Sequence, residues 1–509
     1  MKRLMALLLA LLLALPAFAW ADDLFVSYTS NFSAGTDGWY ARSGDGLAAL
    51  EVTSDGLKIT GRSGTWNSPG RDFPLTNGKK YKVQVKVLQE QEANVEFILS
   101  AAHTKHGAES YSNLGRATAP KGRWVTITAT YTATDYDKYV LYVETNGNPN
   151  LDFTIKDFEV VIDEIAYDMT LPSLKELYAD YFDVGNALGR PEALNKDRMA
   201  FVASQFNILT HGNELKPDFV LNASECRKVV KDDPTAVAVS FSNAKPMLDF
   251  CQKNGIKVHG HVLVWHSQTP DWFFRENYDR NGDYVSREVM LGRLDNYIRL
   301  IMEHMDANYP GLIVSWDVVN EAVADGSTKL RESNWTRVVG DDFVNRAFEI
   351  ARKHAPADVK LYYNDYNTPQ EPKLTGILKL LESLVAEGNI DGYGFQCHYQ
   401  AGWPSLQAIE TAIQKVSDLG LQIRISELDI EIGTTSRADL SKQAERYRDL
   451  MKLFVKYADN IDAVQIWGLT DDQSWKADKN PLIFDGKALP KPAFNALVSL
   501  AEGLKSEGE

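Results

Sequence analysis

Residues 361–396 read LYYNDYNTPQEPKLTGILKLLESLVAEGNIDGYGFQ. The two ends of this stretch, 361–364 and 392–396, are short apolar runs of the length of a buried strand, and the residues between them carry apolar side chains at helical spacing. A strand, a helix and a second strand in that order form the unit from which parallel sheets are built. This stretch therefore predicts an α/β fold.

The same alternation continues from about residue 172 to near the end of the chain. Eight short apolar runs are predicted to be strands: residues 182–185, 206–210, 258–264, 313–319, 361–364, 392–396, 423–426 and 463–467. Strands that alternate with amphipathic helices in this number predict a (β/α)8 barrel, or TIM barrel, which we place at residues 172–505.

The preceding segment, residues 22–165, has a different pattern. Polar and apolar residues alternate in KKYKVQVKV (79–87), WVTITATY (124–131) and YVLYV (139–143), as in strands with one buried face. Asn77-Gly78 marks a turn before the first of them. This segment has no long helical period, so it is predicted to be an all-β sandwich of the jelly-roll type. The chain is therefore predicted to be multidomain.

The first residues differ from both segments. Lys2 and Arg3 are basic, and residues 4–19 are mostly Leu and Ala. Cleavage after Ala19 or after Ala21 would fit the small-residue pattern of a cleavage site. This pattern is typical of a secretory signal peptide, predicted at residues 1–21, so we expect a secreted, extracellular protein that leaves the membrane after cleavage. A membrane anchor is the alternative, but the apolar run is short for a bilayer span.

Composition argues against several classes of function. The formal net charge is −15 and the sequence has no basic stripe, so nucleic acid is not expected as a partner. The sequence also lacks the Cys-x-x-Cys and His-Glu-x-x-His spacings of common zinc sites. Its three cysteines, Cys226, Cys251 and Cys397, are too few for a disulfide framework, and a bond between Cys226 and Cys251 stays open.

Polar and aromatic residues follow the predicted barrel strands. The chemistry of such barrels lies at the C-terminal ends of their strands, so we expect these residues around one site. At or just beyond those ends stand Asn213, Lys216, His261, Trp265, His266, Asn320, Glu321, Asn364, Asp365, Tyr366, Gln396, His398, Glu427, Asp429, Trp467 and Trp475.

Two carboxylates in this set, Glu321 after the fourth strand and Glu427 after the seventh, are expected to face one another across the barrel mouth. Glycoside cleavage with retention needs two carboxyl groups about 5–5.5 Å apart. One stays protonated to donate to the leaving oxygen, and the other is ionised to attack the anomeric carbon. Nearby Trp and Tyr side chains offer flat apolar faces for sugar rings, and amide and Lys side chains offer hydrogen bonds to hydroxyls.

Seven motifs along residues 173–505 resemble those of glycoside hydrolase family 10, the endo-β-1,4-xylanases. They are GNELKPD (212–218), GHVLVWHSQTPDWF (260–273), WDVVNEA (316–322), YNDYN (363–367), GFQCHY (394–399), ISELDI (425–430) and IWGLTDDQSW (466–475). The resemblance implies a (β/α)8 barrel and an endo-β-1,4-xylanase that hydrolyses internal bonds of xylan with retention. It also implies that xylan and xylo-oligosaccharides are the partners, that the protein is a monomer, and that catalysis requires no cofactor.

The resemblance further implies a role for each residue. Glu321 is implied as the acid/base and Glu427 as the nucleophile. The implied supporting residues are Asn320 on the sugar 2-hydroxyl, His398 orienting Glu427 with Asp429 behind it, and Gln396 and Tyr366 holding the acid/base. The implied substrate-binding residues are Asn213, Lys216, His261, Trp265, Asn364, Trp467 and Trp475.

One position departs from the family pattern. Gly212 stands where the motif often has Glu before Asn213. Since glycine supplies no side-chain acceptor, a contact with the second sugar on the glycone side, at subsite −2, is expected to be missing or rerouted. Glu214 is an alternative acceptor for that contact.

In the N-terminal segment, three stretches resemble family 22 carbohydrate-binding modules: DGWYARSG (37–44), GRSGTWNSPGRDF (61–73) and YVLYVETNGNPNLDFTIKDFEV (139–160). Tryptophan and tyrosine rings can stack on pyranose faces. The alternative is that Trp66 and Tyr142 belong to the core. Such modules can carry a structural calcium, whose ligands we do not assign. The sugar contacts implied by the resemblance are Arg42, Trp66, Tyr111, Tyr142 and Glu144.

Two other functions stay open. A β-1,4 or mixed-linkage glucanase could use the same barrel, provided that the space near Trp467 and Trp475 accommodates the hydroxymethyl group that glucose has and xylose lacks. A non-catalytic polysaccharide-binding protein is the alternative from another class, and the presence of both Glu321 and Glu427 argues against it.

Overall fold

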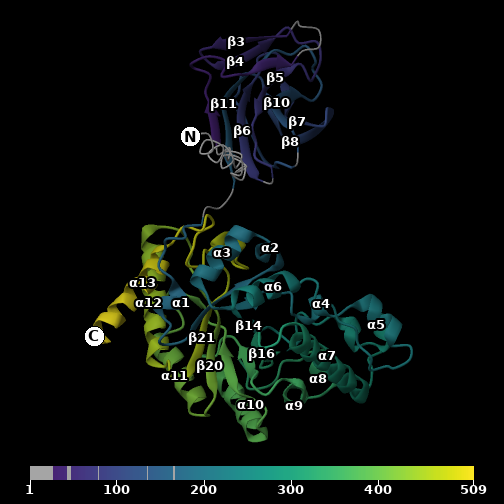
Figure 1. The fold of residues 1–509 in the computed structure, drawn as a ribbon, viewed down its shortest axis with the longest axis vertical. Coiled ribbons are helices and arrows are strands. Elements are labelled where there is room, and N and C mark those ends of the chain that lie inside the picture. Colours follow the sequence, from purple (N-terminus) through teal and green to yellow (C-terminus); the bar gives the residue numbers. More distant parts are fainter. Residues whose placement is uncertain (1–26, 43–47, 78, 135, 164–166, 509) are drawn as a thin grey trace, which may run out of the picture. The chain divides into compact units, whose positions relative to one another are not determined.

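The computed structural model describes residues 27–42, 48–77, 79–134, 136–163 and 167–508, and the predicted signal peptide lies outside them. The chain forms two compact units, Met1–Ile165 and Ala166–Glu509, each with its own hydrophobic core (Figure 1). The first unit is all-β and the second contains a parallel β-barrel, which confirms the predicted fold class.

The first unit is built from two antiparallel sheets. One has the strand order β3-β4-β11-β6-β9, with β1 paired to β11, and the other has the order β2-β5-β10-β7-β8. Alternate residues of the predicted strand 79–87 are buried in β6, so its period-2 pattern marks the face that covers the core. The strands are β1 (Ser27–Ser30), β2 (Tyr40–Arg42), β3 (Ala49–Thr53), β4 (Gly56–Thr60), β5 (Ser68–Phe73), β6 (Lys80–Leu88), β7 (Asn94–Lys105), β8 (Ala108–Pro120), β9 (Val125–Thr132), β10 (Lys138–Thr145) and β11 (Phe153–Ile162).

Eight parallel strands form the barrel of the second unit, and each overlaps one predicted strand. The sheet closes because β14 pairs with both β13 and β16, while β12 pairs with β21. The barrel strands are β12 (Asp183–Leu188), β13 (Ile208–His211), β14 (Lys257–Gly260), β16 (Ile313–Asn320), β17 (Lys360–Asp365), β18 (Gly392–Phe395), β20 (Gln422–Glu431) and β21 (Ile461–Ile466). Two short strands, β15 (Val264–Trp265) and β19 (His398–Gln400), pair with the C-terminal ends of β16 and β20.

Helices surround these strands (Figure 1). In α11, for example, Ser405 caps the first turn by accepting the N–H of Ala408, and Ile409, Ile413 and Val416 lie on the buried face. The helices are α1 (Leu174–Leu177), α2 (Arg190–Ala193), α3 (Lys196–Gln205), α4 (Pro217–Val220), α5 (Ala223–Val229), α6 (Lys245–Asn254), α7 (Arg287–Asn308), α8 (Asn334–Val338), α9 (Phe343–His354), α10 (Lys373–Glu387), α11 (Leu406–Ser417), α12 (Arg437–Lys456) and α13 (Pro492–Gly508).

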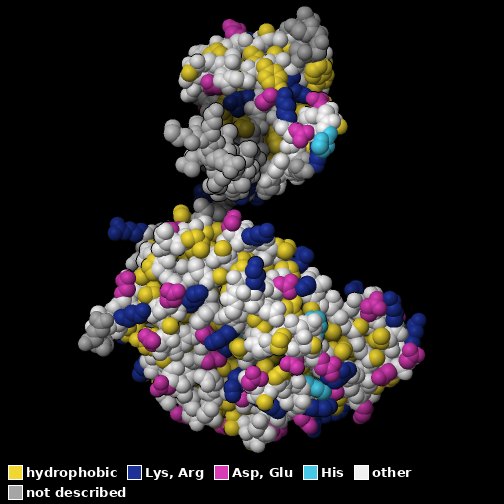
Figure 2. Space-filling view, viewed as in Figure 1, with side chains coloured by type: hydrophobic (Ala, Val, Ile, Leu, Met, Phe, Trp, Pro, Cys, Tyr) yellow, Lys and Arg dark blue, Asp and Glu magenta, His cyan; other side chains and the backbone are white. Residues whose placement is uncertain are grey.

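The structure also answers the question left open about the cysteines. Cys226, Cys251 and Cys397 are all buried free thiols, so Cys226 and Cys251 do not form a disulfide. Within the described residues, no helix is both long enough and apolar enough to cross a membrane. Figure 2 shows Lys and Arg side chains interspersed with Asp and Glu over the visible face of the second unit.

Candidate active site

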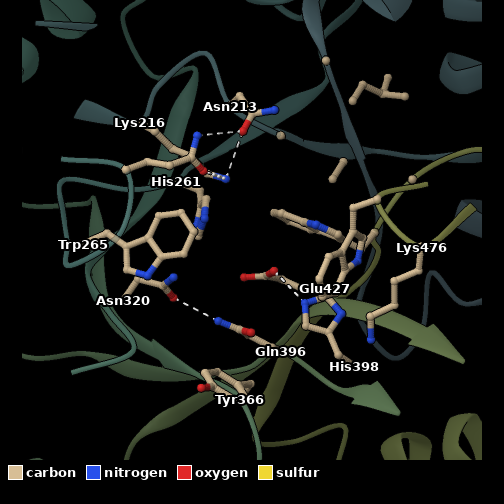
Figure 3. Close-up of a pocket in the computed structure, with 18 of the residues that line it drawn as sticks. Asn213, Lys216, His261, Trp265, Asn320, Tyr366, Gln396, His398, Glu427 and Lys476 are labelled. Atoms are coloured by element: carbon tan, nitrogen blue, oxygen red, sulfur yellow. Dashed lines mark hydrogen bonds and ion pairs between the residues drawn. The ribbon is translucent and has the colours of Figure 1, made fainter. Parts of the chain in front are cut away.

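A pocket of about 700 Å³ lies where the C-terminal ends of the barrel strands meet. Most residues predicted for the site line it, and their side chains converge on its interior (Figure 3). The predicted residues in its lining are Asn213, Lys216, His261, Trp265, Asn320, Glu321, Tyr366, Gln396, His398, Glu427, Trp467 and Trp475.

Both carboxylate oxygens of Glu427, in β20, have a hydrogen-bond partner. The Asn364 amide donates to Oε1 at 2.7 Å, and His398 Nε2 lies 3.1 Å from Oε2. The other nitrogen of that imidazole, Nδ1, lies 2.8 Å from Asp429 Oδ2, which also accepts the indole N–H of Trp475 at 2.8 Å. The orientation of Glu427 is therefore fixed from both sides.

The charges of this cluster decide the protonation state of Glu427. Burial alone lowers the pKa of His398, but the charge of Asp429 and the hydrogen bonds to Asp429 and Glu427 outweigh burial and raise that pKa to about 10. Burial alone raises the pKa of Glu427, but the hydrogen bond from His398 and the nearby His261 hold it below its ordinary value. Glu427 is therefore ionised beside an imidazolium, as a carboxylate nucleophile must be.

Glu321 has a different environment. It follows the last residue of β16 and has a φ of +56°, in the left-handed region that is strained for a side chain of this kind. Its Oε1 accepts from the Gln396 amide at 2.9 Å and its Oε2 from the Trp265 indole at 3.0 Å. Both donors are neutral, so Glu321 has no counterpart of the imidazolium that bonds Glu427.

A chain of hydrogen bonds joins the two carboxylates. Asn320 Oδ1 accepts from Gln396 at 3.1 Å and from Asn364 at 2.9 Å. Since these two amides also donate to Glu321 and Glu427, a single network sets the positions of both carboxylates.

A second set of hydrogen-bonded polar side chains lines the pocket beyond the C-terminal end of β13. Lys216 Nζ donates to Asn213 Oδ1 at 3.2 Å and to Gln268 Oε1 at 2.9 Å, and the Gln268 amide donates to Asn213 at 3.3 Å. Burial lowers the pKa of Lys216. His261 Nδ1 lies 2.8 Å from the buried Asp317, and its ring centroid lies 5.5 Å from that of Trp467.

The structure corrects two predicted roles. Asn364 is fully buried and outside the pocket lining, so it positions Glu427 and cannot contact substrate as predicted. Tyr366 lines the pocket, but its hydroxyl bonds Asp325 and accepts from Arg331 at 3.0 Å. The contact predicted between Tyr366 and the acid/base is therefore replaced by a contact with these charged residues.

The structure has room for a side chain at Gly212, the position where the sequence departs from the family motif. Gly212 lines the pocket, and the nearest atom to a Cβ placed there is the Leu188 carbonyl oxygen, at an ordinary contact of 3.6 Å. Glu214, the alternative acceptor, is buried and already accepts the backbone N–H of Arg190 at 2.6 Å and of Asn213 at 3.3 Å. Glu214 also lies outside the pocket lining, so it does not replace a carboxylate at position 212.

Sequence reasoning missed some pocket residues, because they lie in the connections between strands and not at the strand ends. Gln268 stood within the quoted motif 260–273, and Lys476 directly follows Trp475, so adjacency to the motifs was the available signal. The missed residues with polar side chains are Glu192, Gln268, Asn367, Gln473 and Lys476.

In the first unit, strand register places four of the predicted sugar contacts, Arg42, Tyr111, Tyr142 and Glu144, on one face of the sheet β2-β5-β10-β7-β8. Tyr142 in β10 pairs with Gly70 in β5, which pairs with Tyr40 in β2. Residues paired in this way project from the same face. Strand β7 pairs with both β10 and β8, and its register places Tyr111 of β8 on the same face. Tyr40 is an exposed aromatic residue that the sequence reasoning missed.

The predicted sugar contacts differ in their exposure and in their partners. Trp66 is 47% exposed, which excludes a core role, and Tyr111 is exposed with its hydroxyl on Glu109 at 2.7 Å. Glu144 accepts from Ser100 at 2.6 Å. Tyr142 does not offer the predicted stacking face, because it is 4% exposed and the Arg42 guanidinium covers its ring at 3.6 Å from the centroid.

The side chains of the described residues do not form a metal-binding cluster. Among the residues that the structure describes, no group of three or more His, Cys, Asp or Glu could hold a metal ion. The structural calcium of the first unit stays a prediction.

Comparison with family models identifies both units. Residues 173–500 match the model of glycosyl hydrolase family 10. The chain belongs to this family. Residues 26–150 match the model of a carbohydrate binding domain, so the family 10 barrel follows an N-terminal carbohydrate-binding domain.

Known relatives share both units. The family 10 chain is 35% identical to endo-1,4-beta-xylanase A of Thermotoga neapolitana over 506 residues, which cover 93% of this chain and 46% of the relative. It is 33% identical to endo-1,4-beta-xylanase Y of Acetivibrio thermocellus over 545 residues, 98% of this chain and 50% of the relative. The chain thus spans about half the length of the curated relatives it matches.

A solved structure resembles most of the chain. It contains the CBM22-1 and GH10 modules of endo-1,4-beta-D-xylanase 10B from Clostridium thermocellum, complexed with xylohexaose. The two are 31% identical with a TM-score of 0.61, and the match covers 93% of this chain and 97% of that one.

Proposed function

We propose that this chain is a retaining endo-β-1,4-xylanase in which Glu321 is the general acid/base and Glu427 the nucleophile. The observation that carries the proposal is the contrast between two carboxylates of one pocket. His398, as a cation, holds Glu427 ionised, whereas Glu321 accepts hydrogen bonds from neutral donors. Two carboxyl groups with unlike environments can divide the acid and nucleophile roles.

The reaction would proceed in two displacements. In the first, a carboxylate oxygen of Glu427 bonds the anomeric carbon, the bond to the leaving oxygen breaks, and Glu321 gives its proton to that oxygen. In the second, Glu321 takes a proton from water, the water oxygen bonds the anomeric carbon, and the ester to Glu427 breaks. Asn364 and His398 support this role by holding both oxygens of Glu427 in place.

Xylan is the proposed substrate. The relatives reported above are endo-1,4-beta-xylanases, and the similar solved structure holds xylohexaose. Trp467 and Trp475 in the pocket lining supply aromatic surfaces for sugar rings. Secretion and a monomeric state are part of the proposal. The motif at residues 1–21 supports secretion, which would bring the enzyme to a polymer too large to enter a cell.

Chromatography of the products from xylan, barley β-glucan and cellulose tests this assignment. We expect short xylo-oligosaccharides from xylan, with the β-anomer appearing first in time-resolved NMR because two inversions at the anomeric carbon restore its configuration. Comparable rates on β-glucan would instead favour the glucanase alternative. An α-anomer as the first product would contradict the retaining mechanism.

We also propose that the first unit binds the xylan chain through the exposed Trp66. Replacing Trp66 with alanine should weaken binding to insoluble xylan about tenfold, since a lost ring contact of about 1.4 kcal/mol has that effect. Binding is measured by depletion from solution, in a chain that also carries Glu427→Ala to prevent hydrolysis.

Trp124→Ala is the matched control, because Trp124 precedes β9 in the other sheet and stacks with Lys156 at 4.2 Å. It should bind xylan like the parent chain. If a folded Trp66→Ala chain also binds like the parent, Trp66 is not a sugar contact.

A further inference from the structure

The turn that carries Glu321 is held by a buried tyrosine on the neighbouring strand. Tyr363, in β17, accepts the backbone N–H of Ala322 at 2.9 Å and that of Val323 at 3.2 Å. These are the two residues after Glu321, whose own N–H donates to the Asn364 carbonyl at 2.9 Å. Three consecutive N–H groups are thus fixed to β17 where the backbone of Glu321 adopts its left-handed conformation.

The hydroxyl of Tyr363 is itself held by a buried ion pair. It donates to Asp365 Oδ2 at 2.5 Å, so its single proton and both lone pairs are used. The other oxygen, Oδ1, lies 2.8 Å from Lys373 Nζ and accepts the Tyr366 N–H at 2.8 Å. Tyr363, Asp365 and Lys373 are at most 1% exposed.

We propose that Tyr363 is a positioning residue of the acid/base. Its phenol, oriented by Asp365 and Lys373, holds the turn 321–323 so that the Glu321 carboxyl meets Trp265 and Gln396 in the pocket. Tyr363 lies outside the pocket lining and therefore acts through Glu321 rather than on the sugar. The inference rests on the proposed function, in which Glu321 donates the proton.

The same network places charge near the acid/base. Burial raises the pKa of Asp365 to about 6, although Lys373 and Tyr363 oppose this and the negative charge of Glu321 adds to it. Further charged or titratable groups around Glu321 and this network are Asp325, Arg331, Tyr366, Tyr393 and His266.

Tyr363→Phe tests the proposal, because it removes the hydroxyl and keeps the buried ring. We expect kcat/KM for phenyl xylobioside, a poor leaving group, to fall about tenfold or more, since proton donation is impaired. For 2,4-dinitrophenyl xylobioside, which needs little proton donation, kcat/KM should stay within about twofold. A folded variant that loses activity equally on both substrates, or on neither, would overturn the proposal.

Tyr393→Phe is the matched control. Tyr393 is equally buried, its ring lies 5.9 Å from that of Tyr363, and its hydroxyl bonds Thr368 at 2.7 Å rather than the turn 321–323. It should leave the ratio of the two kcat/KM values unchanged. A leaving-group effect in this control as large as in Tyr363→Phe would also overturn the assignment to Tyr363.

If Tyr363→Phe fails to fold, as a thermal melt would show, Asp365→Asn decides the question. This variant keeps the phenol but replaces the carboxylate that accepts its proton, while Lys373 retains Asp325 as an ion-pair partner. The phenol is then held less firmly, so kcat/KM should fall more for phenyl xylobioside than for 2,4-dinitrophenyl xylobioside. Equal losses on the two substrates, or no loss on either, would overturn the proposal.

Glu321→Ala, measured on the same two substrates, separates this inference from the proposed function. If Glu321→Ala itself shows no leaving-group selectivity, the proposed acid role fails. If it shows that selectivity and Tyr363→Phe does not, only the inference about Tyr363 fails.

Discussion

Replacing Glu427 with alanine is expected to reduce hydrolysis of xylan by roughly 10⁵–10⁶-fold, the scale on which loss of a covalent nucleophile acts. Without this carboxylate no ester to the sugar can form. Asn364 and His398 would remain around the vacated position and leave room for a small anion. Added azide should therefore restore turnover of 2,4-dinitrophenyl xylobioside in part. Initial rates with and without azide measure both effects.

The matched control is Glu431→Ala, which removes a carboxylate from the same strand. Glu431 pairs with Lys476 and lies outside the pocket lining. That variant should keep activity within about tenfold of the parent and show no response to azide, because Glu431 does not line the pocket. A Glu427→Ala chain that hydrolyses xylan at the parent's rate without azide would refute the nucleophile assignment.

Glu321→Ala should show a different kinetic pattern. Proton donation matters most when the leaving group is a poor one, so kcat/KM for phenyl xylobioside and xylan should fall by about 10²–10⁴-fold. The fall for 2,4-dinitrophenyl xylobioside should be far smaller. The measurement is kcat/KM, because it reports the step in which the leaving group departs.

Glu332→Ala supplies the comparison for Glu321, because Glu332 lies outside the pocket lining. It should leave both substrates near parent rates. Equal losses on good and poor leaving groups in Glu321→Ala would contradict the acid role.

The barrel strands could be predicted because parallel strands covered on both faces are short and uniformly apolar. In β18, for example, residues 392–395 read GYGF and are all buried, and the predicted strand 392–396 covers them. The site followed from the strand ends, where Glu321 and Glu427 stand. The strand pattern cannot identify residues that reach the pocket from loops, and for that reason Gln268 and Lys476 were missed.

The errors concern the direction of side chains at positions that were otherwise placed correctly. Asn364 stands at a strand end, as predicted, but its amide points to Asn320 and Glu427 inside the barrel. Tyr142 lies on the same face of its sheet as Tyr111 and Glu144, but Arg42 covers its ring, with Gly70 making room at that point. Neither contact follows from period or composition, because each depends on a partner far away in the sequence.

The configuration of the azide products tests the division of roles most directly. With azide and 2,4-dinitrophenyl xylobioside, Glu427→Ala should yield the α-azide, because azide attacks the substrate once from the face that Glu427 occupied. Glu321→Ala should yield the β-azide, because azide then attacks the ester on Glu427. NMR of the two products distinguishes these anomers. The β-azide from Glu427→Ala together with the α-azide from Glu321→Ala would reverse the two assignments and contradict the account.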